Sequence, residues 1–205
     1  NTGSLVTTLV GYPPNSRITD LIWVGNTLYS MSLFEALIIW DMVTYQYSHI
    51  LEVSGIDLAV SPNGETLAIA DFLRTFLVDL NTMTISPFAE HPIQLSSITW
   101  SPDGQKIVVG AMDGTISIWD LDNSNNPEII WDINTPDEAP TIVDIHWNDG
   151  YLAIRQIYND SVVILDDQTS EALDTILVEN GRFIWSGNTG YYATFRNEPI
   201  QLHQY

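Results

Sequence analysis

Five polar residues recur at one position of a repeated pattern in this chain. The position lies near the start of the first, innermost strand of each repeat, and it holds Asp20, Asp57, Ser97, Asp144 and Arg182. Three carboxylates and one guanidinium could bind a peptide side chain, a sugar or a cation such as calcium, which prefers several oxygen ligands. A pair of carboxylates could also act as acid and base on a glycosidic bond. The alternative is structural, because an aspartate can accept backbone N–H bonds from a neighbouring segment.

Short strands in a repeat of about forty residues must position these side chains. One strand of each unit ends in an aromatic or aliphatic residue before a tight turn, at Trp23, Val60, Trp100, Trp147 and Trp185. A later strand ends in aspartate, at Asp41, Asp79, Asp120 and Asp166. The spacings between successive residues are closely similar in the two series. They predict an all-β protein, a β-propeller built of four-stranded antiparallel blades.

We expect a single propeller domain covering residues 1–205. The blades are predicted at about 18–51, 56–88, 96–133, 141–178 and 182–205. The last unit has only three strands, and a predicted strand at 4–11 has no blade of its own. We therefore expect strand 4–11 to pair in the last blade and to close a five-bladed ring, which would remove exposed sheet edges. The alternative is that the chain forms part of a propeller with six to eight blades.

The third unit resembles the WD40 repeat family through the segments SITWSPDG, MDGT and ISIWD within residues 97–120. Partial matches occur at 59–70 with 76–80, and at 37–42. The Gly-His dipeptide that this family carries before the first strand of a blade is missing, and His91 is a poor substitute. The resemblance therefore does not establish the family's buried Ser/Thr-His-Asp-Trp network, although Asp113 and Trp119 are present. The resemblance implies a non-catalytic interaction module.

The predicted register gathers two sets of loops on the top face of the propeller. These are the loops between consecutive blades and the loops between the second and third strands of each blade. Arginines and exposed aromatic side chains are typical of protein interfaces. We predict a surface for a protein or peptide partner that bears an acidic group, made of Phe34, Phe72, Arg74, Met112, Tyr158, Arg182 and Arg196. The alternative is that each arginine pairs with a local carboxylate and that the apolar side chains turn inward.

Charge and composition exclude several classes of function. The chain has 26 acidic and six basic residues, for a net charge of −20, so it repels nucleic acids and anionic membrane surfaces. It has no cysteine, and its four histidines lack zinc-site spacing, so no metal or cofactor is expected. No apolar run is long enough to insert into a membrane. The charge slightly favours an extracellular or cell-surface location over a cytoplasmic one.

An enzymatic or sugar-binding propeller is the second interpretation. A carbohydrate-binding or glycoside-hydrolase-like propeller would use Asp20, Asp57 and Asp144 at the mouth of its central channel. The ring contains no glutamate, and the turn sequences are those of the non-catalytic family. We therefore expect a scaffold and no enzyme.

Overall fold

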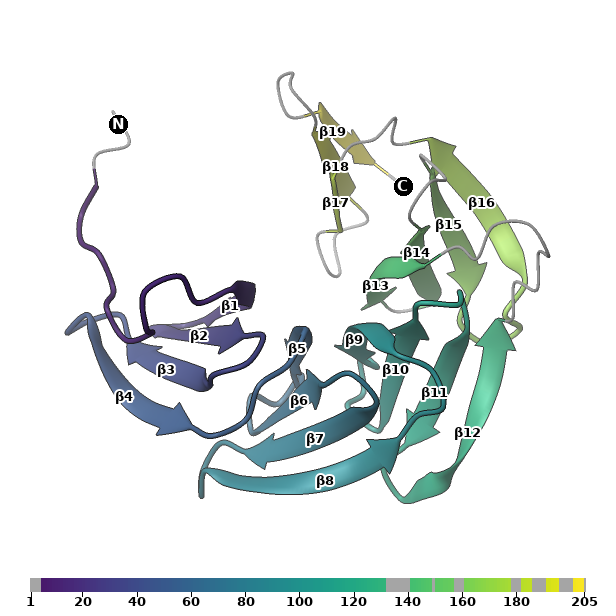
Figure 1. The fold of residues 1–205 in the computed structure, drawn as a ribbon. Helices are drawn as coiled ribbons and strands as arrows, with labels where there is room; N and C mark the ends of the chain where they lie inside the picture. The colour runs from purple at the N-terminus through teal and green to yellow at the C-terminus, as the bar shows by residue number, and fades with distance from the viewer. Residues whose placement is uncertain are drawn as a thin grey trace.

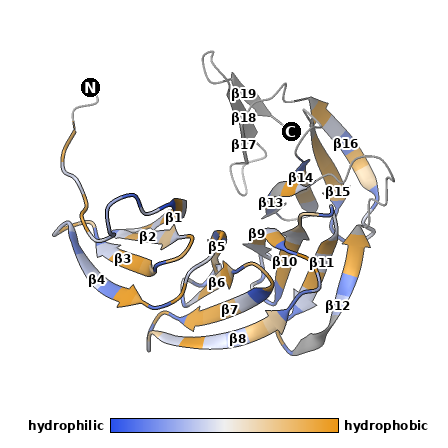
Figure 2. Ribbon diagram, viewed as in Figure 1, coloured by the Kyte–Doolittle hydropathy of each residue, from blue (hydrophilic) through white to orange (hydrophobic). Residues whose placement is uncertain are grey.

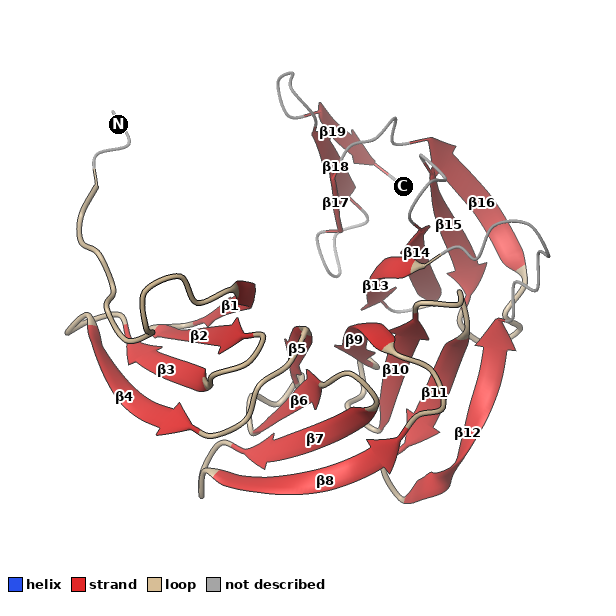
Figure 3. Cartoon of the chain, viewed as in Figure 1, coloured by secondary structure: helices blue, strands red, loops and turns tan. Residues whose placement is uncertain are grey.

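The chain forms a curved array of β-sheets in a computed structural model (Figure 1). The structure describes residues 5–131, 141–148, 150–156, 161–177, 182–185, 191–195 and 201–204. Every regular element in these residues is a strand (Figure 3). Among the same residues, no helix has the length and apolar character needed to cross a membrane.

Four sheets contain four antiparallel strands each, paired in chain order. Blade 1 comprises β1 (Ile18–Val24), β2 (Thr27–Ser32), β3 (Leu37–Asp41) and β4 (Gln46–Leu51). Blade 2 comprises β5 (Asp57–Val60), β6 (Thr66–Ala70), β7 (Arg74–Asp79) and β8 (Thr84–Glu90). Blade 3 comprises β9 (Leu95–Trp100), β10 (Lys106–Ala111), β11 (Ile116–Asp120) and β12 (Asn123–Trp131).

Blade 4 comprises β13 (Ile142–Asn148), β14 (Tyr151–Gln156), β15 (Ser161–Asp166) and β16 (Ala172–Leu177). A fifth sheet has three strands, β17 (Arg182–Trp185), β18 (Tyr191–Phe195) and β19 (Gln201–Gln204). These sheets confirm the predicted all-β class and the four-stranded antiparallel blades.

The core lies between blades. Successive side chains of a strand point to opposite faces, so a sheet covered on both sides needs apolar residues at consecutive positions. The inner strands β6 and β10 meet this need with the runs LAIA and IVVGA, in which every residue is buried. Met31 and Leu37 of blade 1 pack with Leu67 and Ile69 of blade 2. Figure 2 shows β6 and β10 mainly in the hydrophobic colour, next to the innermost strands β5 and β9.

Blade 1 stands at one end of the arc, and its outward side is open (Figure 1). Leu21 and Trp23 on β1 are 58% and 60% exposed, whereas their equivalents on β9, Ile98 and Trp100, are 4% and 6% exposed. Trp100 Nε1 donates to the carbonyl of Ala59 in the preceding blade at 2.9 Å. Trp23 Nε1 instead donates to Gly25 in its own turn, at 2.7 Å. The innermost strand of blade 1 therefore lacks the cover that a preceding blade gives β9.

The predicted strand at residues 4–11 is not formed. The described part of it, residues 5–11, has no strand structure. Leu9 and Tyr12 pack instead against Ile38 and Trp40 of β3. A Cβ atom on Gly11 would lie 2.7 Å from the Trp40 ring, so only glycine allows this close approach. Leu5, Val6 and Val10 of the same segment are exposed, and the sheet of β17, β18 and β19 has three strands. Closure of a five-bladed ring remains a prediction.

Candidate functional site

The predicted ring residues lie near the start of the innermost strands β1, β5, β9 and β13. The N–H of Ile98 in blade 3 donates to Asp57 of blade 2 at 2.8 Å. The N–H of Leu58 in blade 2 donates to Asp20 of blade 1 at 3.3 Å. Each carboxylate therefore holds the innermost strand of the following blade, as the structural alternative predicted. Ser97 occupies the same position in blade 3 and is buried.

Asp57 is held in an environment that disfavours its charge. Burial raises its pKa well above the ordinary value, and the neighbouring carboxyl of Asp20 raises it further. The hydrogen bond from Ile98 acts in the opposite direction, and the more distant charge of Asp144 adds a smaller increase. Together these effects favour the protonated form of the Asp57 carboxyl.

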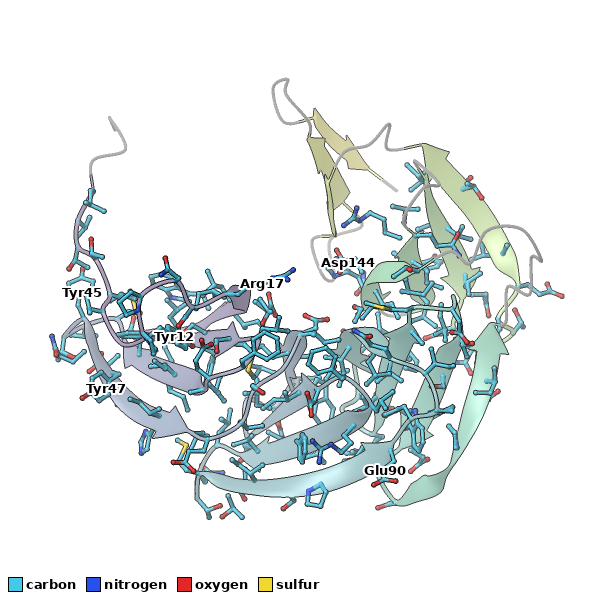
Figure 4. All side chains as sticks on the ribbon, in the orientation of Figure 1. Tyr12, Arg17, Tyr45, Tyr47, Glu90 and Asp144 are labelled. Atoms are coloured by element: carbon cyan, nitrogen blue, oxygen red, sulfur yellow. The ribbon has the colours of Figure 1, made fainter. Side chains whose placement is uncertain are left out.

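The fourth ring residue, Asp144, lies at the inner edge of the arc on blade 4 (Figure 4). Its carboxylate is 3.4 Å from Nε2 of His146. The side chain of Arg182, at the start of β17, lies outside the described residues. Over the described parts of the chain, no three histidine or carboxylate side chains come close enough together to hold a metal ion.

The top-face apolar residues are exposed. Phe34, Phe72 and Met112 lie in the loops between the second and third strands of blades 1, 2 and 3, and they are 72%, 37% and 42% exposed. The rings of Phe34 and Phe72 stack with centroids 6.4 Å apart and planes 17° apart. The structure therefore brings together two residues that are far apart in the sequence, and these side chains do not turn inward.

Backbone hydrogen bonds extend this exposed pair across blade 3. The carbonyls of Phe72 and Leu73 each accept an N–H from the segment that enters blade 3, at 2.8 Å. The N–H of Met112 donates to the carbonyl of Gln94 in the same segment at 2.9 Å. This segment carries Ile93, which is 39% exposed. We refer to Phe34, Phe72, Leu73, Ile93 and Met112 as the apolar row.

Arg74 is engaged within its own blade. Its guanidinium contacts the carboxylate of Asp71 at 3.0 Å and lies 5.1 Å from the centre of the Phe76 ring. Pairing with a local carboxylate was the alternative to a role in binding an acidic partner. Two other predicted contact residues, Tyr158 and Arg196, lie outside the described residues.

Two clusters of polar and aromatic side chains lie at positions where the sequence left the family's network open. Nε1 of Trp40 donates to Oγ of Ser30 at 2.8 Å, and the hydroxyl of Tyr12 lies 2.9 Å from the same Oγ. His91 lies 2.8 Å from the hydroxyl of Thr75, and its ring meets Trp119 edge-on at 4.8 Å. Tyr12 and His91 precede their tryptophans by equal numbers of residues.

The role of His91 was therefore underestimated, and that of Tyr12 was missed. The pair Gly11-Tyr12, at the place of the family's Gly-His dipeptide, is the sequence signal that could have revealed it. Burial lowers the pKa of His91 to about 4, so its imidazole is neutral at pH 7.

A cleft of about 250 Å³ lies between blades 3 and 4, at the turns opposite the top face. Its walls include Lys106 and Asp103 of blade 3 and Trp147 and Asp167 of blade 4. Nε1 of Trp147 donates to the carboxylate of Asp167 at 3.1 Å. Much of the polar lining is thus used in contacts within the blades.

Residues 83–120 match the family model described as "WD domain, G-beta repeat". The chain is 27% identical over 121 residues to COMPASS component SWD3 of Saccharomyces cerevisiae, covering 58% of this chain and 38% of that protein. It is 28% identical over 143 residues to the WD repeat-containing protein 89 homolog of Dictyostelium discoideum, covering 68% and 40%. It is 32% identical over 116 residues to ribosome biogenesis protein YTM1 of Laccaria bicolor, covering 52% and 26%. The chain thus spans less than half the length of these relatives.

Among solved structures, the β-propeller domain of Myceliophteria thermophila Cps50 (Swd1) is similar, with a TM-score of 0.72 and 13% identity. The match covers 89% of this chain and 63% of that chain. At this identity the likeness shows the fold alone, and it confirms the predicted β-propeller.

The expected preference for an extracellular or cell-surface location is wrong. A COMPASS component and a ribosome biogenesis protein are intracellular, and both are relatives of this chain. A high acidic charge also favours solubility in any compartment, so it could not decide the location. Residues 83–120 thus carry a WD40 repeat, and the chain is similar to WD40-repeat proteins.

Proposed function

We propose that this chain is a non-catalytic protein-binding module that uses the top-face loops of its propeller. The observation that carries the proposal is the stacked, exposed pair of Phe34 and Phe72 within the apolar row. Contiguous exposed apolar surface on a soluble protein marks contact sites, and aromatic residues dominate the binding energy of interfaces. The row draws on loops of three blades, and backbone hydrogen bonds join the loops of blades 2 and 3 to the segment between them.

The relatives support binding to other proteins. SWD3 is named as a component of COMPASS, and YTM1 is named as a ribosome biogenesis protein. Neither name describes an enzyme, which supports a non-catalytic role for this chain. The described carboxylates Asp20 and Asp57 are also occupied with backbone contacts between blades.

The predicted acidic group on the partner has less support. Arg74 is paired with Asp71, and the side chains of Arg182 and Arg196 lie outside the described residues. Arg17 is exposed at the inner edge of the arc (Figure 4) and is the described arginine best placed to meet a carboxylate.

The test is a capture experiment with the double variant Phe34→Ala, Phe72→Ala. The matched control is Val43→Ala, which truncates a side chain that is 66% exposed in the turn between β3 and β4, opposite the top face. Proteins bound from a native extract are identified by mass spectrometry, and circular dichroism checks that each variant folds. We expect the double variant to lose partners that the control retains. Retention of every partner by the folded double variant would contradict the proposal.

A further inference from the structure

In each of blades 1, 2 and 3, the loop between the second and third strands carries a carboxylate beside its exposed apolar side chain. Glu35 follows Phe34, Asp71 precedes Phe72, and Asp113 follows Met112. The same association of an acidic and an apolar residue therefore occurs on three successive blades. It gives the row a negative edge along its length.

Two of these carboxylates are available to a partner's positive charge. Glu35 is exposed and accepts a hydrogen bond from the hydroxyl of Ser32, which lowers its pKa and keeps it ionised. Asp113 is half-buried, and one of its oxygens accepts the N–H of Thr115 at 3.0 Å. Within the described residues neither forms an ion pair, whereas Asp71 is already paired with Arg74.

The electrostatic field of the rest of the chain is negative, like the edge of the row. Asp20 and Asp144 also lie near the start of the innermost strands β1 and β13, and the whole chain has a net charge of −20. Such a field attracts cationic ligands and repels anionic ones. One unpaired arginine, Arg17, opposes it on the described top face.

We propose that the apolar row binds a cationic segment of a partner protein, in which apolar side chains alternate with lysine or arginine. The proposal rests on the proposed function, since it specifies the partner of the same surface, and it replaces the acidic group expected from the sequence. In an extended segment, successive side chains point in opposite directions. Apolar side chains can then contact Phe34, Phe72 and Met112 while their neighbours reach Glu35 and Asp113.

The carboxylates beside the row should mainly affect how fast a partner associates and which partner is accepted. Opposite charges at the rim of an interface increase the association rate and exclude partners of the wrong sign, whereas buried aromatic anchors supply most of the affinity. Binding should therefore need both components and should weaken as salt screens the rim charges.

The experiment compares three sets of synthetic peptides of equal length on the intact chain, by titration calorimetry at low and high salt. One set combines apolar residues with lysine, the second combines the same apolar residues with glutamate, and the third combines serine with lysine. We expect the apolar–lysine set to bind most tightly, and its affinity to fall with salt. The Phe34→Ala, Phe72→Ala variant should lose this binding.

A pair of double variants with equal net charge tests the negative edge. Glu35→Gln with Asp113→Asn keeps the hydrogen-bond acceptors and removes both charges beside the row. Glu65→Gln with Asp122→Asn removes two exposed charges from turns on the opposite face. The first pair should weaken binding of apolar–lysine peptides by about two- to twenty-fold, from the usual strength of exposed charge pairs. The second pair should leave it unchanged.

The proposal is overturned if the apolar–lysine peptides bind no better than the other two sets, or if both double variants weaken binding equally. Its failure is distinguishable from that of the proposed function. If the Phe34→Ala, Phe72→Ala variant loses its extract partners while peptides show no preference for lysine, the binding face stands and the charge assignment fails. If that variant keeps its partners, the binding face itself is wrong.

Discussion

Asp57 connects blades 2 and 3, and its removal should destabilise the protein by a measurable amount. In Asp57→Ala the N–H of Ile98 loses an acceptor that lies at 2.8 Å, and Ile98 is only 4% exposed, so water cannot replace it. A buried donor left without a partner costs about 1–3 kcal/mol. For a chain of this size, each kcal/mol lowers the Tm by roughly 2–4 °C, so we expect a fall of about 2–12 °C.

The effect should depend on pH with a definite sign. Because the pKa of Asp57 is higher in the folded protein than in the unfolded chain, the folded state holds the proton more tightly. The carboxyl's contribution to stability is therefore fully present below its unfolded pKa and is lost as pH rises through the folded pKa. The loss caused by Asp57→Ala should be largest at about pH 4 and below, and smaller at about pH 8. Asp57→Asn keeps an acceptor and cannot ionise, so it should become more stable than the wild type as pH rises.

Thermal unfolding followed by circular dichroism across this pH range measures both effects. Asp122→Asn is the control, because it removes a charge from an exposed turn without touching a neighbouring blade. The reasoning would be refuted if Asp57→Ala melted like the wild type at low pH, or if Asp57→Asn lost stability relative to the wild type as pH rises.

Three further predictions follow from the blade contacts. Tyr12→Phe removes a hydroxyl that lies 2.9 Å from Oγ of Ser30, and it should lower the free energy of unfolding by about 1 kcal/mol, as measured by chemical denaturation. An unchanged denaturation midpoint would show that the contact is weak. Burial lowers the pKa of His91 to about 4, so the protein should lose stability as pH falls from about 6.5, the pKa of this ring in the unfolded chain, towards 4. An NMR titration of the folded protein in which the His91 ring titrates near 6.5 would contradict this. If the five-bladed ring closes, Thr8→Cys with Leu202→Cys should cross-link within one molecule through a short bis-maleimide, since the chain has no cysteine of its own. Cross-links formed only between molecules, or none, would count against closure.

The strands and blades could be predicted from the sequence because their signals are local. The turn Ser101-Pro102-Asp103-Gly104 and the Trp119-Asp120 strand end lie within one blade, and Gly104 takes the positive φ of 71° that such a turn requires. The position of the ring aspartates followed from the same register. Their contacts with backbone N–H groups of the next blade were predicted as one of two alternatives.

The remaining features depend on contacts between blades, which spacing alone does not specify. Ile93 belongs to the apolar row only because its segment bonds to the loops on either side. Arg74 shares the top-face loops with Phe72, but its rotamer directs it to Asp71 and Phe76. The segment before Tyr12 had the composition of a strand, but its described residues form none; Leu9 packs against β3, whereas Leu5, Val6 and Val10 are exposed.

The open side of blade 1 has a consequence for the behaviour of this chain in solution. Leu21 and Trp23 present apolar surface of the kind that is buried elsewhere in the arc, and such surface drives molecules to associate. The net charge of −20 acts against this, because like-charged copies repel one another over the Debye length. Salt shortens that length and leaves the apolar attraction intact. The colloidal stability of the chain therefore depends on ionic strength, and self-association should increase as salt is added.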